Sequence, residues 1–148
     1  MSRRVETVSR ITQVINHQKE VIELQVIQIQ KRLSLEENRL AHLENQLQGT
    51  LITFEEKVKD RWVLDSQEMD YLYGISSHLF TMIEKKNKEV SKIQEELTAQ
   101  KAILLEAYKK KKSFEILKNK MVFQERRDAE LWEQKSMDYL TIVKRSRR

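Results

Sequence analysis

The chain of 148 residues lacks cysteine and proline and contains only two glycines, Gly49 and Gly74. Sheets and compact α/β domains need turns built mainly from glycine, proline, asparagine and aspartate, so this composition favours a few long helices. The absence of cysteine excludes a disulfide framework, a thiol nucleophile and cysteine-ligated metal sites. Only 39% of the residues are hydrophobic and 34% are charged, which favours a long charged helical chain over a broad core.

Long apolar runs are also missing. No window approaches the roughly 18 continuous apolar residues of a membrane span, and the start of the chain does not lead into an unbroken apolar signal-peptide core. We therefore expect a cytoplasmic protein without direct membrane insertion.

Apolar residues recur at alternating steps of three and four from Val5 onward, which indicates a helix with a narrow coiled-coil seam. This pattern predicts a first helix over about residues 4–60, with Gly49 inside it. One heptad column holds Val5, Thr12, Lys19, Val26, Leu33, Leu40, Leu47 and Phe54, and the other holds Val8, Ile15, Ile22, Ile29, Glu36, Leu43, Thr50 and Lys57.

The period is lost near residue 60, which places a turn at about residues 60–65. Asp65 and Glu68 can form a capping box, and Leu64 with Met69 has the spacing of a hydrophobic staple, so a second helix is predicted over about residues 66–143. Its columns are Met69, Ser76, Ile83, Val90, Leu97 and Leu104, and Leu72, Leu79, Lys86, Ile93, Gln100 and Ala107. We expect one all-α domain over residues 1–148, a long antiparallel two-helix coiled-coil hairpin whose second helix is the longer.

The longer second helix implies an overhang. If the chain reverses near residue 63, Val5 lies opposite Met121, and the stripe beyond has no intramolecular cover. Trp132 and Tyr139 fall in this overhang, and we interpret them as anchors for a partner protein. For three aromatic residues near the turn, binding to a partner and packing between the helices remain equally open: Tyr71, Tyr73 and Phe80.

Positive charge is concentrated in the last part of the chain, where residues 108–148 contain 13 Lys and Arg but 6 Asp and Glu. Such asymmetry often marks an electrostatic partner surface. The run Lys109–Lys112 follows the seam and is diluted by later acidic residues, unlike the basic region of a zipper protein. We expect an acidic protein partner and no nucleic acid, with a basic nucleic-acid-associated coiled coil as the alternative from another class.

No residue pattern predicts catalysis. The chain contains neither a GxxxxGK[ST] nor a GxGxxG phosphate-binding motif, and its three histidines form no HxxxH pair. We therefore predict a protein that is not an enzyme, with no catalytic, cofactor-binding or metal-binding residues.

Over about residues 65–143 the chain resembles the FliJ family of flagellar type III export proteins. The resemblance is carried by Ser66-Gln67-Glu68-Met69 with Tyr71-Leu72, by the segment Lys112–Lys118 (KSFEILK), and by Met137-Asp138 after the long charged helix. Residues 1–60 match only as a coiled coil of suitable length. The stalk proteins of virulence injectisomes have the same architecture and are the nearest alternative.

This resemblance implies a stalk similar to the central shaft subunit of rotary ATP synthases. Its partners would be the hexameric export ATPase, the cytoplasmic linker of the export gate membrane protein and, for some members, export chaperones, at the cytoplasmic base of the export apparatus. By position, the gate contact would fall on Ile75, Leu79, Met82 and Lys86, and the basic end facing the ATPase would comprise Arg3, Arg4, Lys144, Arg145, Arg147 and Arg148.

Overall fold

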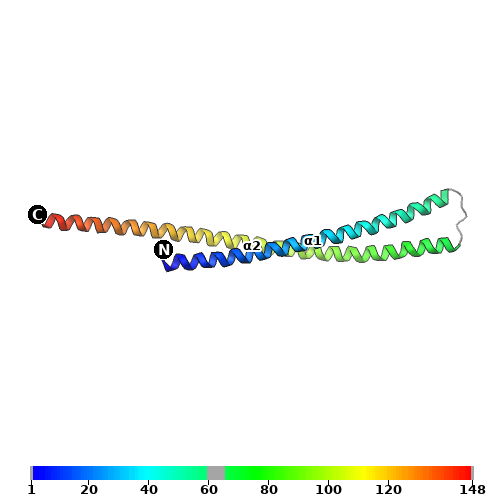
Figure 1. Ribbon diagram of the computed structural model, residues 1–148, viewed down its shortest axis with the longest axis horizontal. Helices are drawn as coiled ribbons and strands as arrows, with labels where there is room; N and C mark the ends of the chain where they lie inside the picture. The colour runs from blue at the N-terminus through cyan, green and yellow to red at the C-terminus, as the bar shows by residue number, and fades with distance from the viewer. Residues whose placement is uncertain (1, 60–65, 148) are drawn as a thin grey trace. The chain divides into compact units, whose positions relative to one another are not determined.

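A computed structural model describes residues 2–59 and 66–147 of the chain (Figure 1). It contains two helices that pack against each other, α1 (Arg3–Lys59) and α2 (Ser66–Ser146), and these described residues include no strand. The expected all-α fold with a longer second helix is thereby confirmed. The expected turn at 60–65, with Asp65 as a cap and Leu64 in a staple, lies outside the described residues.

Polar groups at the helix ends satisfy part of the free backbone. The hydroxyl of Ser2 accepts a hydrogen bond from the Val5 N–H at 3.3 Å, and the Ser2 carbonyl accepts one from the Glu6 N–H at 3.1 Å. At the other end of the chain the Ser146 hydroxyl donates to the Val143 carbonyl at 2.9 Å. Ser2 therefore caps α1, because it binds donors that the first helical turn cannot pair.

The seam positions predicted for α1 are its least exposed residues. All sixteen residues of the two heptad columns are buried or half-buried, whereas nearly all the others are exposed. Gly49 continues the helix, as expected, and a Cβ there would meet nothing within 4 Å. The buried residues of α1 are Val5, Val8, Ile15, Val26, Ile29 and Leu43.

The predicted columns of α2 likewise coincide with buried and half-buried positions from Leu72 to Ala107, and half-buried positions continue at the same spacing to Glu125. Met69 is the exception, because its side chain is 47% exposed. It lies at the rim of a hollow beside Leu51 and Phe54, so only one side of it is covered. The prediction that Met69 belongs to the seam was therefore wrong.

Contacts divide the chain into two units, each made of one piece of α1 and one piece of α2. Unit 2 comprises residues 24–102. Within it, the Gln100 amide donates to Gln25 at 2.7 Å, Arg32 pairs with Glu96, and Lys57 pairs with Glu68 at 3.8 Å. Residue numbers rise on α1 as they fall on α2, so the two pieces of unit 2 are antiparallel.

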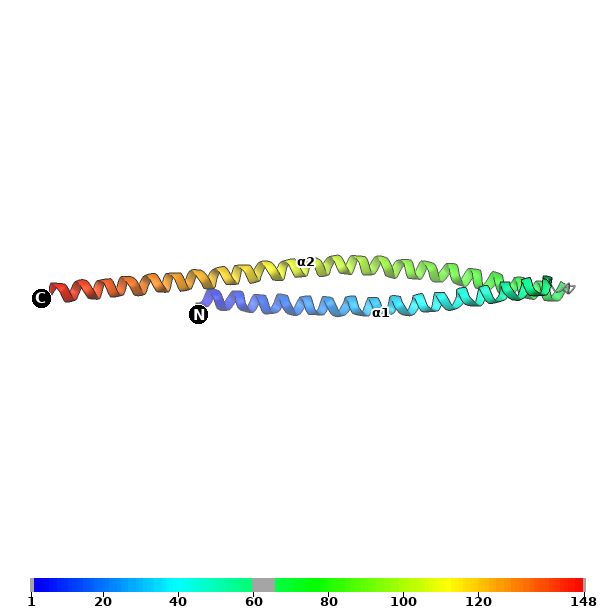
Figure 2. The ribbon, with the colours of Figure 1, turned by 90° about the horizontal axis from the view of Figure 1, so that it is seen from above.

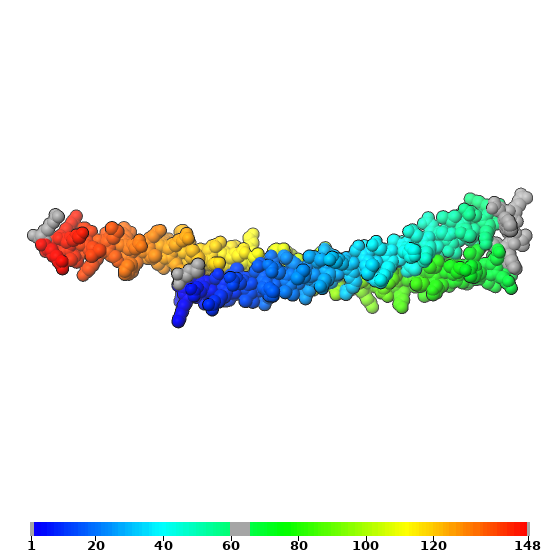
Figure 3. Space-filling view, in the orientation of Figure 1, coloured from blue at the N-terminus to red at the C-terminus, as the bar shows by residue number. Residues whose placement is uncertain are grey.

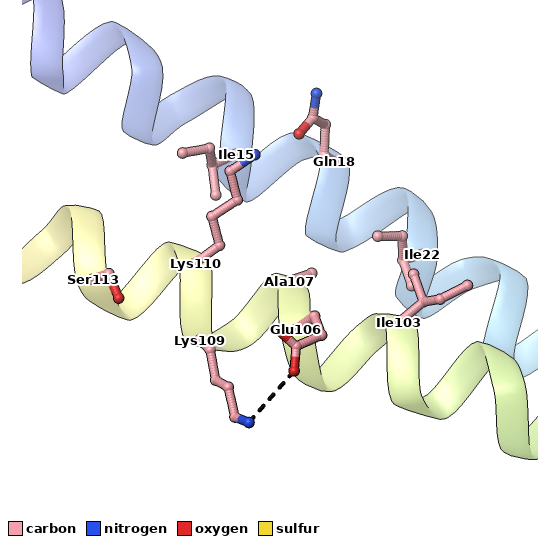
Figure 4. Close-up of a pocket in the computed structure, with 9 residues that line it drawn as sticks. All are labelled: Ile15, Gln18, Ile22, Ile103, Glu106, Ala107, Lys109, Lys110 and Ser113. Carbon is pink, nitrogen blue, oxygen red and sulfur yellow. Dashed lines mark hydrogen bonds and ion pairs between the residues drawn. The ribbon is translucent and has the colours of Figure 1, made fainter.

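Unit 1 comprises residues 1–23 and 103–148. Its two pieces are also antiparallel, because Ile22 lies beside Ile103 while Ile15 lies beside Lys110, further along α2 (Figure 4). Within this unit α2 continues past the start of α1 as a single helix (Figure 2). We call residues 128–147 the C-terminal extension.

The seam predicts a sharp contrast between two leucines on the unit 2 part of α1. Leu43 is 9% exposed, whereas Leu24 is 60% exposed. Replacing Leu43 by Ala should lower the free energy of unfolding by about 2–3 kcal/mol, because the lost side chain leaves a gap between the helices. Leu24→Ala should change it by less than about 0.5 kcal/mol. Urea denaturation of both variants measures the difference, and equal effects would contradict the seam.

Candidate partner-binding surfaces

The C-terminal extension carries the largest group of exposed apolar side chains in unit 1. Trp132 is 70% exposed and Tyr139 is 67% exposed, as the prediction of partner-binding aromatics requires. Four further members flank the two aromatics closely and were not predicted as partner anchors from the sequence: Leu131, Met137, Leu140 and Ile142, each at least 49% exposed. In the space-filling view no other segment of unit 1 lies over the visible face of the extension (Figure 3).

The basic residues assigned to an ATPase-facing end do not form one cluster. Arg3 and Arg4 begin α1, whereas Lys144, Arg145 and Arg147 lie at the tip of the extension. Because α2 runs on past the start of α1 (Figure 1), the two groups are separated along α2 by roughly 35 Å, at 1.5 Å per residue. Arg148 lies outside the described residues.

The four residues assigned to the gate contact occupy different environments in unit 2. Leu79 is 8% exposed and lies in the seam, and Ile75 is half-buried over a hollow that it shares with Gly49 and Thr50. Met82 is 40% exposed. Lys86 belongs to the seam, where its side chain is engaged within the chain. Of the four, only Met82 presents much of its surface to solvent.

A polar layer interrupts the seam of unit 2 at Glu36 and Lys86. The Lys86 ammonium lies 2.7 Å from Glu36 and 3.0 Å from Glu89, and Arg39 approaches Glu36 at 2.7 Å. The hydrogen bond from Lys86 lowers the pKa of Glu36, and the hydrogen bonds to Glu36 and Glu89 raise the pKa of Lys86. A polar pair in an otherwise apolar seam favours one register, since sliding the helices would separate the charges.

Unit 1 has a corresponding polar cluster around Tyr108. The Tyr108 hydroxyl donates to Glu23 at 2.5 Å, and Lys19 lies 3.4 Å from Glu23 and 4.9 Å from the centre of the Tyr108 ring. This hydrogen bond lowers the pKa of Glu23 and raises the pKa of Tyr108. The sequence pattern did not predict a role for Tyr108. The sequence feature that pointed to such a cluster is Lys19, because a lysine in a seam is stabilised by a nearby hydrogen-bond acceptor and by the face of an aromatic ring.

Beside this cluster, unit 1 has a hollow of about 530 Å³ between α1 and α2 (Figure 4). Ile22 and Ile103 meet across it, and the stem of Lys110 reaches toward Ile15. Lys109 points away and pairs with Glu106 at 3.4 Å. Lys111 pairs with Glu115 at 3.7 Å. Part of the lysine run is therefore used within the chain.

The aromatic residues early in α2 differ in their surroundings. Tyr71 is 69% exposed and Phe80 is 57% exposed. Tyr73, at 77% exposed, borders an apolar hollow of about 260 Å³ that includes Leu51 and Phe54. More than half of each side chain is accessible, so packing between the helices does not account for them.

Within residues 2–59 and 66–147, no group of three or more His, Asp or Glu residues could hold a metal ion. Neither helix there has a segment long and apolar enough to cross a membrane.

Comparison with known proteins gave no match among protein-family models, curated proteins or solved structures.

The Glu36–Lys86 layer predicts a pH dependence of stability. The pKa of Glu36 is lowered from 4.5, so its contribution is present above pH 4.5 and is lost as pH falls through the lowered value. The pKa of Lys86 is raised from 10.5, so its contribution is present below that pH and is lost only as pH rises through the raised value. Glu36→Gln should therefore lower the melting temperature at neutral pH.

Glu36→Gln should also reduce the decrease in melting temperature between about pH 5 and pH 3, because glutamine has no carboxyl group to protonate. Glu37→Gln is the matched control, since Glu37 is the exposed neighbour outside the seam. Thermal melts followed by circular dichroism across this range measure both effects. Parallel pH profiles for wild type and Glu36→Gln would show that the layer does not couple to acid unfolding.

Proposed function

We propose that this chain is a non-enzymatic stalk of a flagellar type III protein export apparatus, built as an antiparallel two-helix coiled-coil hairpin. The resemblance of residues 65–143 to the FliJ family motivates the proposal. The structural observation that carries it is the C-terminal extension, a single helix with exposed Trp132 and Tyr139 that continues past the start of α1. A stalk of this kind requires a slender element with anchors and no active-site cavity.

The dimensions and charge of the extension suit insertion into the ring of the hexameric export ATPase. A single helix is about 10–12 Å wide with its side chains, and twenty residues span about 30 Å. Its tip carries Lys144, Arg145 and Arg147, so an acidic ring entrance would attract it over a distance. The aromatic residues lie behind this tip and supply apolar contact once the helix is inside.

The second proposed contact of the stalk is with the export gate, and we assign it to a surface of unit 2. Met82 and the hollow bordered by Tyr73 are its accessible apolar features, and they would bind the cytoplasmic linker of the export gate protein or an export chaperone. In this role the protein works in the cytoplasm at the base of the export apparatus. The alternative is the equivalent stalk of a virulence injectisome. Nucleic-acid binding is less favoured, because Lys109 and Lys111 already pair with glutamates.

The charged tip gives a kinetic prediction for the ATPase. Replacing Lys144, Arg145 and Arg147 by Gln should slow association with the purified hexameric export ATPase by about 3–10-fold at low salt, because electrostatic steering is lost. The salt dependence of the association rate should weaken as well. Stopped-flow tryptophan fluorescence at two salt concentrations measures both quantities.

The matched control removes the same charge elsewhere on α2 by replacing Lys101, Lys112 and Lys120, all exposed, with Gln. It should leave most of the association rate intact. If both triple variants slow association equally, general charge and not the tip is responsible. If the wild-type chain does not bind the ATPase at all, the proposed function is wrong.

Met82 is the sharpest probe of the proposed gate contact. Met82→Ala should weaken binding to the export gate linker by about 1–2 kcal/mol, because an exposed anchor is lost, while the melting temperature changes little. Ile27→Ala is the control, since Ile27 is an exposed apolar residue on α1 of the same unit, at 44%. Titration calorimetry measures the affinities. Unchanged binding by Met82→Ala would remove this residue from the contact.

A further inference from the structure

The seam of α2 continues into the C-terminal extension, where no part of α1 covers it. The contacting positions of α2 end at Glu125; one heptad further on, the same face carries Trp132, from which Ser136, Tyr139 and Val143 follow at steps of four, three and four. Trp132 and Tyr139 on this stripe are more than 60% exposed. Its spacing is that of a helix that packs against another helix.

The charges of the extension are segregated along its length. Residues 128–138 contain four acidic residues and one lysine, whereas residues 139–147 contain three basic residues and no acidic one. Within residues 2–59 and 66–147, none of these charged side chains forms an ion pair. The helix is therefore complementary to a copy of itself that runs in the opposite direction, and a parallel copy would place like charges together.

We propose that the C-terminal extension is a self-association surface, on which the extension of a second copy of this chain packs antiparallel to form a symmetric dimer. Such an interface is isologous, because the same stripe serves both partners. The proposal concerns the chain by itself and does not depend on its binding the export ATPase.

The side chains select one register for this pair. With Trp132 of one copy opposite Val143 of the other, Tyr139 lies opposite Ser136, so each large side chain meets a smaller one. Glu130 then lies opposite Arg145 of the second copy. A shift of the second copy toward α1 would bring its basic tip against Arg3 and Arg4, and like charges would oppose it.

Charge reversal tests the interface without removing any apolar side chain. The acid-reversed variant Glu130→Lys/Glu133→Lys and the base-reversed variant Lys144→Glu/Arg145→Glu each place like charges across the dimer. Sedimentation velocity of the purified full chain up to about 200 μM should show dimers for wild type, and dissociation constants at least 10-fold higher for each variant. An equimolar mixture of the two variants should associate again, within about 3-fold of wild type.

The control Glu84→Lys/Glu95→Lys reverses two exposed glutamates of unit 2 and should dimerise like wild type. Circular dichroism verifies that every variant keeps its helix content. A wild-type chain that stays monomeric over the whole range would overturn the proposal, and so would reversed variants that dimerise normally. A mixture that fails to associate would show that the charges do not pair across an interface.

The relative direction of the two extensions in the dimer can be measured separately. Because the chain has no cysteine of its own, a single introduced cysteine can carry a spin label. A spin label on Ser146→Cys in both copies of an antiparallel dimer should give a separation of about 25 Å or more, since seventeen residues of helix lie between the labels. A parallel dimer would place the labels within about 15 Å of each other and would refute the antiparallel register.

Discussion

The constraint on which this structure depends is that, within residues 2–59 and 66–147, each helix has only one neighbour and therefore buries only one stripe. A strip of residues at steps of three and four is the whole core of each unit, and the remaining surface of both helices faces solvent. Because so little apolar area is buried, the core contains few fully buried side chains, and Val5 is the one below 2% exposure in the described residues. Each seam residue carries a large share of the stability.

Polar residues within such a narrow seam have consequences that they would lack on a surface. Glu36 and Lys86 occupy seam positions, and Lys19 and Tyr108 form the polar cluster of unit 1. These groups contribute less apolar burial than leucine, yet they make pairings that only one register allows. A chain of nearly uniform heptads can slip by seven residues, so register requires irregular positions, and here charged and hydroxyl groups supply them.

The C-terminal extension is the direct consequence of unequal helix lengths. A helix with an apolar stripe and no neighbour leaves large side chains in water, which is unfavourable in a chain that is otherwise highly charged. Both the proposed insertion into an ATPase ring and the proposed dimer would cover Trp132 and Tyr139. The two occupants would compete for one surface, so self-association would limit the amount of chain free to engage a ring.

Much of the fold followed from local pattern. The scarcity of glycine and proline, the heptad columns and the loss of period near residue 60 predicted both helices within a few residues of their ends, since these features act along the chain. The pattern misplaced Met69, because the periodicity of one helix does not tell how closely the other helix approaches it at each position. The exposed aromatics of the extension could also be predicted, once the two lengths were compared.

The sequence by itself determined the helices, their seam residues and the uncovered stripe, because a period of three and four is a property of one helix. Only the tertiary structure decided which polar residues meet across the seam, such as Glu23 with Tyr108 and Glu36 with Lys86. It also separated Arg3 and Arg4 from the basic tip and engaged the ammonium group of Lys86 with Glu36 and Glu89. Those outcomes depend on the register between two helices, and register is set by pairs of residues distant in the sequence.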